Sequence, residues 1–171
     1  CAVPNKNRAR AIAPCFLFPT PRMGFDAMLS PVAVRHVALS VPDLDRALEY
    51  YVGTIGFTLL RRYSWEGSAT IDAAMGVNNS AGEIAMIDLG GFGIELFQFK
   101  SPDPAYPTEP RAIGFGWTHI CLQVANAAEA VAALVDAGAR VHAAPVDTGN
   151  GPYAYTRDPF GNIVEVWEAI V

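Results

Sequence analysis

The stretch VRHVALSVPDLDRALEYYVGTIGF, residues 34–57, decides the fold class of this chain. It begins with an apolar run that is typical of a buried β-strand, yet His36 places an ionisable ring inside that run. A helix should follow, because Asp43 can act as its N-cap and apolar residues recur after it at helical spacing, with Gly53 ending the helix. The stretch therefore predicts a strand that carries a histidine, followed by a helix.

The same order of elements recurs in the second half of the chain. His119 leads another apolar run, and the helix after it is predicted to begin at Asn126 and to be closed by Gly138. Three further strands are expected in each half, and two of those in the first half should form a hairpin around Gly90 and Gly91. We infer one βαβββ unit that is used twice.

These patterns divide the chain into an irregular N-terminal extension and one α+β domain. The prolines of residues 1–30 exclude a long helix, and no strand or helix period runs through that segment. The domain, residues 31–171, comprises module one (32–100), a proline-rich linker (101–115) and module two (116–170).

Composition excludes several classes of protein. With 171 residues, of which 51% are hydrophobic and 17% charged, the chain is typical of a compact globule. Its net charge is −5 and it has no basic stripe, so we expect no nucleic-acid partner. No apolar run approaches the ~20 residues of a membrane span, so no membrane association is expected. The three cysteines lack C-x-x-C spacing, which favours a reducing cytoplasm over a disulfide framework.

Each half also carries a glutamate inside an apolar strand. Glu95 lies between Ile94 and Leu96, and Glu165 lies between Val164 and Val166. An isolated buried carboxylate is costly, so such a charge is expected to have a partner, and a metal ion is the strongest one available. Each half therefore offers one histidine on its first strand and one glutamate on its last.

Side-chain alternation extends this prediction to a cup. If the first and last strands adjoin, as curled βαβββ units allow, His36, Glu95, His119 and Glu165 converge inside it. A lone histidine or glutamate is most often structural, but two of each at equivalent places of a repeat favour a metal site. The residues expected to line the cup and to contact a small-molecule substrate are Phe97, Phe99, Trp117, Gln123 and Trp167.

Three other signals are weaker. His142 has no evident counterpart in the first half, so we expect it at the surface. Arg61 and Arg62 could bind an anion, but a solvated strand end is the favoured interpretation. Cys121 shares the face of His119, but apolar and anionic surroundings should raise the pKa of its thiol and leave it a poor nucleophile.

Four segments together resemble the vicinal oxygen chelate superfamily, the group of glyoxalase I and methylmalonyl-CoA epimerase. They are RHVALSVPDLDRALEYYVGTIGF, IELFQFKSP, THICLQV and RDPFGNIVEVWE. The resemblance covers about residues 32–169 and implies two tandem βαβββ modules that form a curled mixed-sheet cup, with helices outside, around one divalent metal. It implies His36, Glu95, His119 and Glu165 as ligands of that metal.

The resemblance also implies a reaction class. We expect a metal-dependent lyase or isomerase of the glyoxalase I type, which abstracts a proton next to a carbonyl and passes through an enediolate-type intermediate. Glu165 is implied as the general base, with Glu95 as the second candidate. The run Leu96–Phe99 differs from that of glyoxalase I and suggests a more apolar substrate.

The remaining expectations concern the metal, the partner and the alternative functions. Mixed nitrogen and oxygen ligands suit Zn, Ni, Co, Mn or Fe. We expect a homodimer, in which the cup is completed either within one chain or by a half from each of two. The alternatives within the superfamily are an extradiol-type dioxygenase that uses non-haem iron and a metal-free protein that binds a drug or another small molecule.

Overall fold

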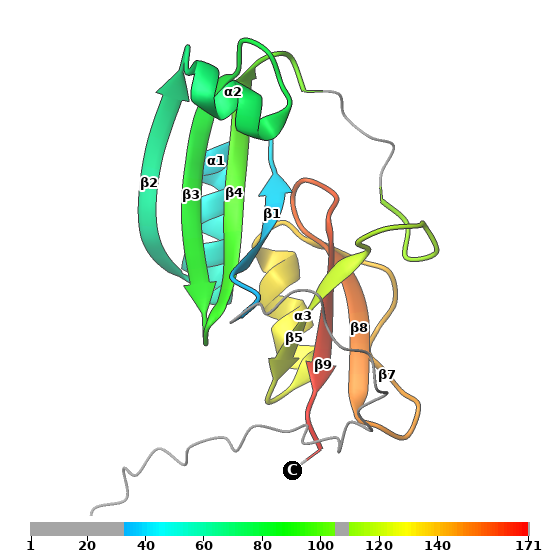
Figure 1. The fold of residues 1–171 in the computed structure, drawn as a ribbon. Helices are drawn as coiled ribbons and strands as arrows, with labels where there is room; N and C mark the ends of the chain where they lie inside the picture. Colours follow the sequence, from blue (N-terminus) through cyan, green and yellow to red (C-terminus); the bar gives the residue numbers. More distant parts are fainter. Residues whose placement is uncertain (1–32, 105–109, 171) are drawn as a thin grey trace, which may run out of the picture. The chain divides into compact units, whose positions relative to one another are not determined.

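Two mixed β-sheets of the same topology form the framework of the protein (Figure 1). The computed structural model describes residues 33–104 and 110–170, so the expected extension, residues 1–30, lies outside the described part. Both sheets belong to one compact unit, residues 35–171.

The strand order confirms the internal repeat, with one correction: the strand expected over residues 139–146 is interrupted, so sheet B has two short strands there and five strands in all. Sheet A consists, in spatial order, of β1 (His36–Ser40), β4 (Phe92–Ser101), β3 (Ala81–Leu89) and β2 (Thr58–Glu66). Sheet B consists of β5 (His119–Val124), β9 (Ile163–Glu168), β8 (Pro152–Arg157) and β6 (Arg140–Val141), and β7 (Val146–Asp147) also pairs with β8. In each sheet the first strand runs parallel to the last, and the other pairs are antiparallel.

The helices begin where side chains cap them. They are α1 (Leu44–Leu48), the π-helix η1 (Glu49–Ile55), α2 (Ala69–Met75) and α3 (Ala127–Asp136). The Asp43 carboxylate accepts the backbone N–H of Arg46 at 3.0 Å, and the Asn126 side-chain oxygen accepts that of Glu129 at 3.0 Å. Both predicted caps are thereby confirmed. None of the described helices is long and apolar enough to cross a membrane.

Two predictions about the first half need correction. The first helix does not end at Gly53 but continues through η1 to Ile55, and Gly56, with φ of 97°, closes it. Gly53 keeps a negative φ, so it does not terminate the helix, whereas Gly56 supplies the left-handed conformation that does. Helix α2 was not predicted, although Ser68 caps its first turn.

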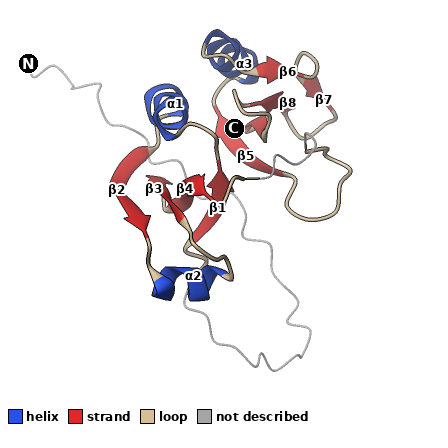
Figure 2. Cartoon of the chain, turned by 90° about the horizontal axis from the view of Figure 1, so that it is seen from above, coloured by secondary structure: helices blue, strands red, loops and turns tan. Residues whose placement is uncertain are grey.

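Side chains alternate between two faces of each sheet. Val37 and Leu39 of β1 pack on the hydrophobic core with Leu96 of β4, and α1 lies against that face of sheet A (Figures 1 and 2). In sheet B, Ile120 and Leu122 of β5 pack against the same hydrophobic core, and α3 contacts β8 and β9. The opposite face of each sheet, here called its open face, therefore carries the intervening residues, His36 and His119 among them.

A buried carboxylate joins the first helix to the turn between β8 and β9. The Tyr51 hydroxyl donates to Asp158 Oδ2 at 2.9 Å, and Asp158 also accepts the backbone N–H groups of Phe160 and Asn162. Burial, and after it the charge of Asp158, raises the pKa of Tyr51 well above its ordinary value. The hydroxyl therefore stays protonated and remains a donor. These hydrogen bonds compensate for the burial of Asp158, which is only 1% exposed.

Candidate metal and active site

In sheet A, the parallel pairing of β1 and β4 brings His36 next to Glu95. Ala38 is the register partner of Glu95, and His36 lies two residues before Ala38 on the same face. His36 Nε2 lies 3.4 Å from Glu95 Oε2, and the two side chains are 31% and 14% exposed. The pair is thus accessible at the open face of sheet A.

Sheet B repeats this arrangement at the same offset. Cys121 is the register partner of Glu165, and His119 lies two residues before Cys121. His119 Nε2 lies 3.0 Å from Glu165 Oε2, with the side chains 27% and 17% exposed. The other ring nitrogen, Nδ1, lies 2.8 Å from the Thr118 hydroxyl oxygen, which holds the ring so that Nε2 faces the carboxylate.

The two pairs fit the donor chemistry of a divalent metal. Bonds of about 2.1 Å place neighbouring donors on one tetrahedral or octahedral metal about 3.0–3.4 Å apart. The observed separations of 3.4 Å and 3.0 Å between nitrogen and oxygen match that spacing. His36 Nδ1 is buried and has no hydrogen-bond partner among residues 33–104 and 110–170, so Nε2 is the nitrogen that this ring presents to a ligand. Each pair can therefore supply half of a set of two nitrogen and two oxygen ligands.

The structure brings the predicted ligands together as two pairs rather than as a group of four. Within residues 33–104 and 110–170, no cluster of three or more His, Cys, Asp or Glu side chains is placed to hold a metal. Both histidines nevertheless line one cavity of about 500 Å³, together with Tyr51, Trp117 and Asn162. The described part of the chain therefore provides two half-sites, meaning the His36–Glu95 pair and the His119–Glu165 pair. It also provides a cavity that both histidines line.

Aromatic side chains line the open face of sheet A. Phe97 and Phe99 stack with ring centroids 5.5 Å apart, and Trp65 packs edge-on against both, at 6.0 Å and 5.4 Å. Sequence reasoning expected the two phenylalanines but missed Trp65, which alternation along β2 places on the same face. Beside Glu95, this surface offers an apolar wall for a substrate.

The three other expected substrate contacts lie in or next to sheet B. Gln123 and Trp167 are register partners on the open face of β5 and β9. The Trp167 indole donates to the Asn150 carbonyl at 2.9 Å, which fixes its ring. Trp117 lines the cavity but is 93% exposed, so the described residues leave most of its ring uncovered.

Tyr155 is a neighbour of this site that sequence reasoning missed. It is the register partner of Glu165 on β8, and its ring lies 5.2 Å from the His119 ring, edge to face. Burial, followed by the charge of Glu165, raises the pKa of its hydroxyl. The alternation of the run GPYAYTRD could have placed Tyr155 on the open face. His142 is exposed, as expected, and stacks on the Tyr155 ring at 6.5 Å.

The surroundings of Cys121 raise the pKa of its thiol, as predicted. Burial raises the pKa of its thiol to about 12, and the charge of Glu165 adds to the rise. At neutral pH the thiol is therefore protonated.

Comparisons with known proteins agree over both halves of the chain. The sequence pattern of the glyoxalase/bleomycin resistance protein/dioxygenase superfamily matches residues 33–166. A 2-epi-5-epi-valiolone epimerase from Actinomyces sp is 33% identical, over 79% of this chain and 78% of the relative. A lactoylglutathione lyase from Salmonella typhimurium is 31% identical, over 78% of this chain and 90% of the relative. A solved glyoxalase family protein from Bacillus cereus superposes with a TM-score of 0.78 at 24% identity, covering 85% of this chain and 99% of that one.

Proposed function

Because the chain belongs to the glyoxalase/bleomycin resistance protein/dioxygenase superfamily, we propose that it is a metal-dependent isomerase or lyase. Its reaction removes a proton from a carbon next to a carbonyl. The observation that carries this proposal is the placement of a His–Glu pair at the same register position of both sheets. The relatives support it, since one is named an epimerase and another a lyase.

The metal would be held by His36, Glu95, His119 and Glu165. When bound, a divalent metal polarises the substrate carbonyl and so makes the neighbouring C–H group more acidic. Glu165 would take the proton from that carbon. It would return the proton to the other face of the same carbon or, where that carbon carries a hydroxyl group, to the neighbouring carbonyl carbon while the hydroxyl proton passes to the carbonyl oxygen. Neither route consumes a second reactant. Glu95 faces the substrate from the other module and is the second candidate for the base. The aromatic residues Phe97, Phe99, Trp117 and Trp167, with Gln123, hold the apolar part of the substrate and exclude water.

A second copy of the chain completes the site in this proposal. Each chain supplies two half-sites, so a homodimer would join His36 and Glu95 of one chain to His119 and Glu165 of the other, giving two complete sites. Exposed apolar side chains in the segment that precedes β5 support an association of this kind: Ile113, Phe115 and Trp117. Cys121 forms no disulfide among the described residues, and a reducing cytoplasm remains the expected compartment.

Mixed dimers test how the site is assembled. His36→Ala and His119→Ala chains, each with its own tag, should bind no metal alone, because each lacks one ligand in every site. When they are co-expressed and purified through both tags, the mixed dimer contains one intact site and one doubly altered site. It should therefore retain about one metal per two chains. A mixed dimer without metal would show that each site is built within one chain.

Proton exchange tests the reaction class. The metal-loaded protein is incubated in D₂O with thiol hemithioacetals, acyl-CoA esters and catechols, and deuterium at the carbon next to the carbonyl is followed by NMR. We expect exchange with a carbonyl substrate and no oxygen uptake. Oxygen uptake with a catechol would instead assign the dioxygenase function, and a protein that takes up no metal would assign small-molecule binding.

A further inference from the structure

An irregularity in β2 decides which way its two arginines point. Leu59 pairs with Ile87, but the next register pair is Arg61 with Met86, so Leu60 is an extra residue that forms a β-bulge. Without the bulge, Arg61 would oppose Ala85, which faces the hydrophobic core. The bulge therefore turns Arg61 onto the open face, and bulges that redirect a side chain are common beside active sites.

On the open face, Arg61 belongs to the same row of residues as Glu95. The row crosses sheet A through the register partners Ala38, Glu95, Met86 and Arg61. Because neighbouring strands lie about 4.8 Å apart, the backbones of Arg61 and Glu95 are about 10 Å apart. A small substrate whose carbonyl lies at Glu95 can therefore reach the Arg61 side chain with another group.

The Arg61 guanidinium contacts an aromatic ring rather than an acid. Its central carbon lies 5.5 Å from the centroid of the Tyr63 ring, a cation–π contact that orients the side chain along the face. No acid of the described residues forms an ion pair with Arg61. Asp88, the acid of β3 that shares this face, accepts the backbone N–H of Gly91 at 3.1 Å.

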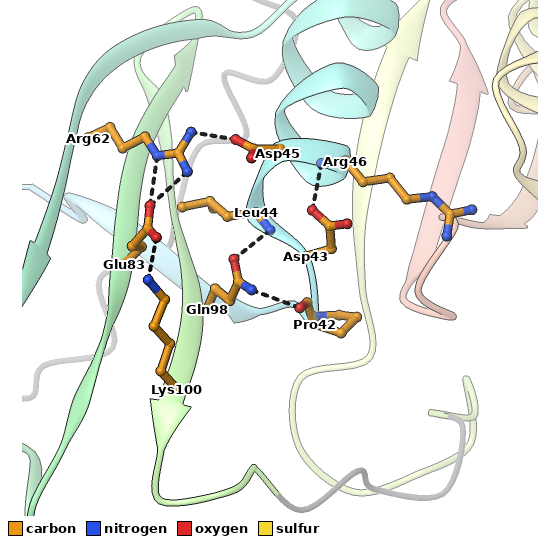
Figure 3. Close-up of polar contacts among 9 residues, drawn as sticks. All are labelled: Pro42, Asp43, Leu44, Asp45, Arg46, Arg62, Glu83, Gln98 and Lys100. Atoms are coloured by element: carbon orange, nitrogen blue, oxygen red, sulfur yellow. Dashed lines mark hydrogen bonds and ion pairs between the residues drawn. The ribbon is translucent and has the colours of Figure 1, made fainter.

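Arg62 shows the contrasting arrangement on the opposite face. It pairs with Asp45 of α1 at 2.5 Å and with Glu83 at 2.7 Å, and Glu83 is also bound by Lys100 (Figure 3). This network explains why a cation is present at position 62. The described residues offer Arg61 no comparable network of ion pairs.

Sheet B has a titratable side chain at the equivalent place. The row of Glu165 crosses Cys121 and Tyr155 and reaches His142, whose backbone N–H donates to the Tyr155 carbonyl at 3.0 Å. His142 thus occupies the position that corresponds to Arg61, so the expectation that it has no counterpart in the first half is wrong. Both sheets end the glutamate row with a side chain that can bind an anion.

We propose that Arg61 binds an anionic group of the substrate, a carboxylate or a phosphate, while the carbonyl lies at Glu95. The substrate is then an anionic carbonyl compound with an apolar body between its two polar ends. The planar guanidinium pairs with either anion through two parallel hydrogen bonds. This inference rests on the proposed function for the position of the carbonyl, but the anion-binding property itself does not depend on turnover.

Binding of matched probes to the full-length protein as purified tests the proposal. The probes are 4-phenylbutyrate, 3-phenylpropyl phosphate and the neutral 4-phenylbutanamide. Dissociation constants come from NMR shifts of the arginine Nε–H signals, and the signal lost in Arg61→Gln identifies that of Arg61. We expect at least one anion to bind about tenfold more tightly than the amide, as a charge-assisted hydrogen bond allows, and to shift the Arg61 signal. The stronger of the two anions identifies the group that the substrate carries.

The variants give a matched comparison. Arg61→Gln should abolish the preference for the anion, Arg61→Lys should retain part of it, and Arg62→Gln should leave it unchanged. Equal affinity for all three probes in the unaltered protein, or a preference that survives in Arg61→Gln, would overturn the proposal. This experiment measures binding and not turnover. Its result can therefore contradict the anion site without contradicting the metal-dependent reaction, and a failed test of the reaction leaves the anion site unaffected.

Discussion

At the scale of single residues, the two glutamates occupy equivalent places but have different neighbours. Glu165 lies between the register partners Cys121 and Tyr155, and its charge helps to raise the pKa of both. Glu95 lies between Ala38 and Met86, which have no titratable group. The repeat thus supplies two carboxylates, and their surroundings distinguish them.

We predict that Glu165→Gln abolishes proton transfer while leaving metal binding largely intact. Glutamine keeps an oxygen ligand and nearly the same volume, but it cannot accept a proton near neutral pH. A positioned base contributes about 10²–10⁴-fold to the rate, so deuterium exchange should fall by that factor.

Glu95→Gln is the matched control for this experiment. Both variants are loaded with metal, and exchange at the substrate carbon is followed by NMR. Exchange that persists in Glu165→Gln and vanishes in Glu95→Gln would assign the base to Glu95. Exchange that persists in both would contradict the proton-abstraction mechanism.

At the scale of elements, close approach of β1 to β4 positions the first His–Glu pair. Gly93 is the register partner of His36, and a Cβ atom there would lie 2.7 Å from the Arg35 carbonyl oxygen and 3.2 Å from His36 Cβ. Only glycine therefore allows β1 to pair so closely at this point. The position of His36 depends on the absence of a side chain in the opposite strand.

We predict that Gly93→Ala moves β1 away from β4 and separates His36 from Glu95. The clash involves backbone atoms, so the free energy of unfolding should fall by about 1–3 kcal/mol, and metal affinity should fall with it. Thermal or urea unfolding and metal titration measure the two effects.

Gly53→Ala provides the comparison, since a Cβ at that helical position meets nothing within 4 Å. Alanine favours helix over glycine, so this variant should be unchanged or more stable by up to about 1 kcal/mol. A Gly93→Ala protein as stable as Gly53→Ala would mean that the strand pairing tolerates a side chain.

The elements also show how much of the structure could be predicted from the sequence. The helix caps Asp43 and Asn126 and the Gly90-Gly91 hairpin were predicted, because each rests on local hydrogen bonds or on a backbone conformation that few residues adopt. The bulge at Leu60 was not predicted, since it is set by pairing with β3 rather than by the residues around it. For the same reason the anion-binding role of Arg61 stayed open until the register was known.

At the scale of the whole molecule, one buried interaction ties the two repeats together. Tyr51 belongs to the first repeat and Asp158 to the second, and their hydrogen bond is 2.9 Å long. The two His–Glu pairs could be predicted from the repeat, because each is formed within one sheet. Whether the two pairs come together at one metal could not be predicted, because that depends on contacts between sheets or between chains.

We predict that Tyr51→Phe lowers the free energy of unfolding by about 1–3 kcal/mol, because it removes a hydrogen bond to a buried carboxylate. Tyr50→Phe is the control, since the buried Tyr50 hydroxyl has no hydrogen-bond partner in the described part of the chain and its loss should cost nothing. Urea unfolding of both variants measures the two changes in the free energy of unfolding. Equal destabilisation would show that the Asp158 contact contributes nothing specific.

Titration of the metal-stripped, full-length protein with Co²⁺ tests the central claim most directly, namely that His36, Glu95, His119 and Glu165 form one metal site. Bound cobalt is counted by elemental analysis after gel filtration. We predict about one ion per chain in the unaltered protein and in His142→Ala, and none in His36→Ala or in His119→Ala. An unaltered protein that binds no cobalt, or one ion per chain retained in either His36→Ala or His119→Ala, would contradict the claim.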